Sequence, residues 1–83
     1  MENEAKERIE RALNDFLDES ISLRAFQFRY TPDAIDIERS GDQSIIGLVY
    51  SVDGILAEGA GRWSESDIRE ELANAVLAHL PVS

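Results

Sequence analysis

Cysteine is absent from this 83-residue sequence, and histidine occurs once. No disulfide can form without cysteine, and zinc and iron–sulfur sites lose their most common ligands. A single histidine cannot replace them. We therefore expect no metal and no cofactor. A cysteine-free composition also favours a cytoplasmic location, where disulfides are rarely used.

Long apolar runs are absent as well. No stretch of the sequence approaches the roughly 18 apolar residues that a membrane span requires. The first residues, Met1–Glu4, are acidic, whereas a secretory signal begins with basic residues followed by an apolar segment. We expect neither a membrane segment nor a secretion signal.

Positive charge is scarce. Lysine and arginine total 8, of which one is lysine, against 17 aspartates and glutamates, so the net charge is −9. Such a surface repels nucleic-acid phosphates and anionic lipids, and no direct binding to either is expected. Acidity commonly keeps a small protein soluble. Adaptation to high salt and imitation of a nucleic acid are two other interpretations of the same charge.

Helical periodicity is present at both ends of the sequence. Between residues 2 and 19, apolar side chains recur at spacings of three and four. Near the other end, Ser64 is a typical N-cap, and Glu65 and Asp67 follow in the first turn, where a helix favours acids. Pro81 ends this second segment. We predict an N-terminal and a C-terminal helix.

The central part of the sequence alternates with period two, which is typical of strands. Phe26, Phe28 and Tyr30 alternate with polar residues, and Asp53-Gly54 is a strong signal for a two-residue hairpin. Turns are also expected at Pro32-Asp33 and at 40–43. The predicted strands are 26–31, 34–39, 44–52 and 55–63.

The lengths of these three turns place most large apolar residues of the strands on one face of a sheet. Residues 1–83 are therefore predicted to form a single α+β domain in two layers. A four-stranded antiparallel meander would form one layer, and both terminal helices would pack on its apolar face, in the order α-β-β-β-β-α.

The opposite face of the predicted sheet carries a small apolar patch. It consists of Ile45, Val49, Leu56 and Ala60, and no element of the predicted fold covers it. Uncovered apolar patches often mark contact sites. We expect a homodimer that uses this face or the open edge of the last strand.

No segment matches a catalytic motif. His79 lies near the end of the last helix, and no serine or cysteine can be placed beside it from the sequence. Gly59-Ala60-Gly61 lacks the lysine and the serine or threonine of a phosphate-binding loop. We expect a protein that is not an enzyme.

These observations favour a small acidic interaction domain with an adaptor or regulatory role, which self-associates and binds a protein partner that the sequence does not identify. The alternative is an acidic mimic of nucleic acid that inhibits a DNA-binding protein. Seven carboxylates between residues 2 and 19 motivate this alternative, but interspersed arginines interrupt any continuous acidic stripe.

Overall fold

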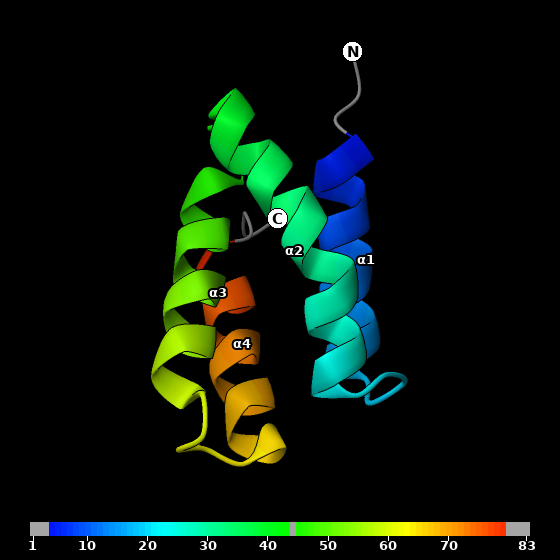
Figure 1. Ribbon diagram of the computed structural model, residues 1–83, viewed down its shortest axis with the longest axis vertical. Coiled ribbons are helices and arrows are strands. Elements are labelled where there is room, and N and C mark those ends of the chain that lie inside the picture. Colours follow the sequence, from blue (N-terminus) through cyan, green and yellow to red (C-terminus); the bar gives the residue numbers. More distant parts are fainter. Residues whose placement is uncertain (1–3, 44, 80–83) are drawn as a thin grey trace.

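The computed structural model describes residues 4–43 and 45–79, and this part of the chain forms four helices. They are α1 (Glu4–Leu17), α2 (Leu23–Ser40), α3 (Ile46–Gly59) and α4 (Glu65–His79). Figure 1 shows α1 beside α2 and α3 beside α4. The two pairs pack on each other through contacts of α1 with α4 and of α2 with α3.

The predicted α+β fold is therefore wrong. No strand occurs in residues 4–43 and 45–79, so there is neither a four-stranded antiparallel meander nor the order α-β-β-β-β-α. The segments predicted as the first two strands form α2, and most of the other two form α3. The predicted turns Pro32-Asp33 and Asp53-Gly54 lie inside helices α2 and α3.

A helical period in α2 explains why the alternation was misleading. Phe26, Tyr30, Ala34 and Ile37 follow one another at spacings of three and four, and all four are buried. Phe28 belongs to the alternation of the first predicted strand, and Ile35 lies in the second predicted strand, but both are exposed. Residues i and i+2 of a helix are about 200° apart around its axis. Side chains that alternate in the sequence therefore lie on two opposite sides of α2.

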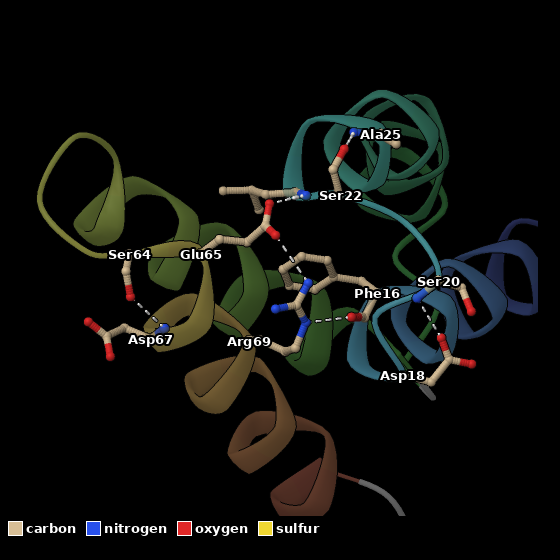
Figure 2. Close-up of polar contacts among 10 residues, drawn as sticks. Phe16, Asp18, Ser20, Ser22, Ala25, Ser64, Glu65, Asp67 and Arg69 are labelled. Carbon is tan, nitrogen blue, oxygen red and sulfur yellow. Dashed lines mark hydrogen bonds and ion pairs between the residues drawn. The ribbon is translucent and has the colours of Figure 1, made fainter.

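The ends of α2 are well defined by capping. The Ser22 side chain accepts a hydrogen bond from the Ala25 N–H at 3.2 Å (Figure 2). At the other end, Gly41 adopts the left-handed conformation with φ 66°, and its N–H donates to the Ile37 carbonyl at 2.8 Å. Pro32 lies well inside the helix and cannot donate a backbone hydrogen bond there.

Helices occupy both terminal segments for which the sequence predicted them. Ser64 caps α4 as expected, because its hydroxyl accepts from the Asp67 N–H at 3.1 Å (Figure 2). Ile68 and Leu72 of α4 enter the core. In α1, the buried residues are Ala5, Ile9, Ala12, Leu13 and Phe16.

A row of stacked aromatic rings runs through the core. The ring centroids of Phe16 and Phe26 are 5.1 Å apart, and those of Phe26 and Tyr30 are 5.2 Å apart. At the end of the row, the Tyr30 hydroxyl contacts the Val49 carbonyl and Asp53 Oδ1, each at 3.1 Å. Burial raises the pKa of Tyr30 well above its ordinary value.

A polar network at the opposite end of the row joins α4 to the turn between α1 and α2 (Figure 2). Glu65 accepts a hydrogen bond from the Leu23 N–H at 2.6 Å and pairs with Arg69 at 3.2 Å. Arg69 Nε donates to the Phe16 carbonyl at 2.7 Å. The hydrogen bond from Leu23, with help from Arg69, lowers the pKa of Glu65.

None of the helices in the described ranges combines the length and the apolar character that a membrane crossing requires.

Candidate functional site

The four residues predicted to form an interface lie in different environments. Ile45 and Val49 are buried in the core, and Leu56 is half-buried against it. Ala60 is exposed just after the end of α3. These side chains therefore do not gather on one exposed face. The exposed apolar surface that could bind a partner has to be sought elsewhere.

The outer side of α2 carries such a surface. Phe28 is 85% exposed, and Ile35, two turns further along the helix, is 43% exposed. Around Phe28 the surface forms a shallow depression of about 500 Å³. We use the term α2 outer face for the residues that line this depression together with Ile35: Arg24, Gln27, Phe28, Thr31, Pro32 and Ile35.

The core contacts of α2 fix the orientation of this face. Phe26 and Tyr30 are buried, and Phe28 between them must therefore point away from the bundle. The Thr31 hydroxyl donates to the Gln27 carbonyl at 2.8 Å, so its hydrogen-bonding capacity is used within the helix. Pro32 contributes an apolar ring and no donor. The depression therefore contains few polar groups that have to stay hydrated.

Charge on α2 is balanced, in contrast to α3 and α4. This helix contains three arginines and three carboxylates. Helix α3 contains two carboxylates and no lysine or arginine, and α4 contains four carboxylates and one arginine. The α2 outer face is thus the apolar surface where a second acidic molecule would meet the least repulsion.

A groove between α3 and α4 holds the one pairing of a serine with a histidine that the described residues contain. Ser51 Oγ lies 2.9 Å from His79 Nε2 in an exposed position. The groove has a volume of about 400 Å³, and Tyr50, Glu58 and Glu71 also line it. This pair could not be predicted from the sequence, because Ser51 was expected on a strand and no spacing in the sequence links the two residues.

The surroundings of this pair do not favour nucleophilic catalysis. Ser51 lies in the middle of α3, where the helix uses the backbone N–H groups that could otherwise stabilise an oxyanion. Apart from Ser51, the His79 ring has no hydrogen-bond or ion-pair partner in the described ranges, so no carboxylate orients it. What the geometry supports is a hydrogen bond that ties α3 to the end of α4.

Two further sets of ionisable groups could hold a ligand. Glu38 and Asp53 lie beside the Tyr30 hydroxyl, and a hydrogen bond with Asp53 raises the pKa of Glu38. Arg8, Arg11, Arg29 and Asp33 line a pocket between α1 and α2. Within residues 4–43 and 45–79, acids and histidine form no group of three that could bind a metal ion.

Comparison of the chain with family models, with curated proteins and with solved structures gave no match.

Proposed function

We propose that this chain is a non-enzymatic protein-interaction domain that self-associates through the α2 outer face. The observation that carries the proposal is the 85% exposure of Phe28 in the middle of an apolar depression. Burying a phenylalanine side chain contributes about 1.5–3 kcal/mol. A partner that covers Phe28 and Ile35 would gain this contribution. The absence of cysteine supports a cytoplasmic location as part of the proposal.

A second copy of the chain is the occupant that we propose for this face. Two molecules that each carry a net charge of −9 repel one another, and the repulsion is least where both surfaces are locally neutral. Phe28 and Ile35 lie at equal distances along α2 from the point between Thr31 and Pro32. In an antiparallel two-fold contact, Phe28 of each copy would therefore face Ile35 of the other.

Light scattering after size exclusion, over a range of micromolar concentrations, tests this proposal. We expect a dimer for the native chain and a monomer for Phe28→Glu, because the substitution buries a charge in the contact. Leu77→Glu is the matched control, since Leu77 is 74% exposed on α4 and lies outside the α2 outer face. A native chain that stays monomeric, or a Phe28→Glu variant that remains dimeric, would contradict the proposal.

The second candidate function is acidic mimicry of nucleic acid. One observation favours it: α3 and α4 together contain six carboxylates but only one arginine. Capture of partners from the native lysate across a salt series tests this candidate. A mimic should capture DNA-binding proteins and release them steeply as salt rises. Partners that bind no nucleic acid, or that stay bound at high salt, would argue against mimicry.

A further inference from the structure

Three of the seven arginines line a single pocket between α1 and α2. Arg8 and Arg11 come from α1, and Arg29 comes from α2. The pocket has a volume of about 230 Å³, and Asp33 completes its lining. In a chain with 17 acids and 8 basic residues, three arginines in one small pocket form an unusual local concentration of positive charge.

Carboxylates hold two of these arginines in place but leave most of their donors free. Arg8 Nε donates to Asp33 Oδ1 at 2.9 Å, and Asp33 is only 8% exposed. Arg29 Nη1 donates to Asp15 Oδ2 at 2.8 Å. A guanidinium group has five N–H donors, and each of these contacts uses one. The contact between Arg8 and Glu4 is 3.7 Å long, which is beyond hydrogen-bonding distance.

Arg11 differs from its two neighbours. It is exposed, and its side chain forms no hydrogen bond or ion pair with any residue in 4–43 or 45–79. Its guanidinium can therefore bind a ligand without breaking a contact of the fold. Arg8 and Arg29, fixed by Asp33 and Asp15, provide a preorganised wall for the same ligand.

We propose that this pocket binds a phosphate group, supplied either as inorganic phosphate or as a small phosphate monoester. Guanidinium groups bind phosphate oxygens through pairs of parallel N–H donors, and arginine is the preferred residue for such recognition. Three cations and one anion line the pocket, and Asp15 and Glu4 contact its arginines from outside the lining, so the site is close to neutral in a chain whose net charge is −9. General attraction of anions is excluded by the net charge of −9, and binding must therefore come from the local arrangement.

This site is separate from the proposed self-association. The arginine pocket lies in the groove between α1 and α2, whereas Phe28 points away from the bundle. The phosphate experiment is therefore performed on both the native chain and Phe28→Glu. Binding by both proteins shows that the site does not depend on the dimer, so failure of one proposal leaves the other testable.

An NMR titration with inorganic phosphate, at neutral pH and at constant ionic strength set with sodium chloride, is the direct test. We expect saturable shifts of the side-chain Nε–H signals of Arg8, Arg11 and Arg29. Arg11→Gln should weaken the affinity about tenfold, because it removes one charge-assisted contact. Arg62→Gln is the matched control, since it removes the same charge from the exposed turn between α3 and α4 and should change the affinity less than about twofold.

The choice of variant keeps the experiment interpretable. Arg8→Gln would leave the buried Asp33 carboxylate without its ion-pair partner and could unfold the chain, whereas Arg11 is exposed. A parallel titration with O-phosphoserine separates the two sources of phosphate. Tighter binding of phosphoserine indicates a monoester, and tighter binding of inorganic phosphate indicates the free ion. Shifts that do not saturate, or an equal loss of affinity in Arg11→Gln and Arg62→Gln, would overturn the proposal.

Discussion

Arg69 lies over the ring of Phe16, with its Cζ atom 4.4 Å from the ring centroid, and its Nε also donates to the Phe16 carbonyl at 2.7 Å. The side chain of Arg69 is only 17% exposed, so both contacts act in a partly desolvated position. Through them the beginning of α4 is attached to the end of α1. Arg69 thus joins the two helix pairs at one end of the aromatic row.

Loss of this contact should weaken the whole bundle. We expect Arg69→Gln to lower the free energy of unfolding by about 1–3 kcal/mol, since it removes a cation–π contact and leaves a carbonyl without its charged donor. Urea unfolding followed by circular dichroism measures the change. Arg62→Gln, in an exposed turn, should stay within about 0.5 kcal/mol of the native chain. Equal effects of both substitutions would show that Arg69 acts only through its charge.

Glu65 should give the stability of the fold a pH dependence in the acid range. The pKa of its carboxyl is lowered in the folded state, so the ionised form stabilises the fold above its ordinary pKa of 4.5. This stabilisation is lost as the pH falls through the folded pKa. We therefore expect Glu65→Gln to be less stable than the native chain at pH 7 and to approach it in stability on acidification below 4.5.

The same measurement on Glu71→Gln provides the control for Glu65. Glu71 also lies on α4 and is exposed, and its side chain has no hydrogen-bond partner among the described residues. A stability difference between the native chain and Glu65→Gln that stays constant from pH 7 to pH 3 would contradict the role of the Leu23 and Arg69 contacts.

Two glycines of α3 should respond in opposite directions to replacement by alanine. A Cβ atom on Gly54 would meet nothing within 4 Å, so Gly54→Ala should stabilise the chain by about 0.5–1 kcal/mol through helix propensity. A Cβ atom on Gly59 would lie 2.8 Å from the Trp63 ring and 3.0 Å from Ile68. Gly59→Ala should therefore destabilise it by about 1–3 kcal/mol. Thermal unfolding curves of the two variants measure these changes in stability. Higher stability of both variants would show that the packing around Gly59 is loose.

The two tyrosines form another matched pair. Tyr30→Phe removes a buried hydroxyl from the Val49 carbonyl and Asp53, and we expect it to cost about 1 kcal/mol. Tyr50 is 61% exposed, so Tyr50→Phe should have almost no effect. Denaturant unfolding of both variants measures the difference. Equal stabilities of the two variants would mean that the hydrogen bonds of the Tyr30 hydroxyl contribute no net free energy to folding.

The sequence was sufficient to predict both terminal helices because their patterns are unambiguous. Between residues 2 and 19 no competing period exists, and Ser64 caps α4 as expected. The prediction for the central part failed because a period of two and a helical period coexist there. Phe26, Phe28 and Tyr30 alternate, but Phe26 and Tyr30 also lie one helical turn apart, and only the second relationship corresponds to burial.

Local turn signals were overridden by packing in the same region. Pro32 and Asp53-Gly54 favour turns in isolation, yet Pro32 lies inside α2 and Asp53 contacts Tyr30 from inside α3. The candidate site could not be located from the sequence because exposure was assigned through the wrong fold. Val49 was expected on a surface and is buried, whereas Phe28 was expected in the core and is exposed.

Cross-linking through an introduced cysteine tests the central claim of self-association most directly, because the chain has no cysteine of its own. Thr31 lies at the middle of the α2 outer face, so an antiparallel contact would bring two copies of this position together. On mild oxidation at micromolar concentration, Thr31→Cys should form a covalent dimer efficiently, whereas Leu77→Cys on α4 should remain mainly monomeric. Equal cross-linking of the two variants, or undiminished cross-linking of Thr31→Cys in a Phe28→Glu background, would contradict a dimer built on α2.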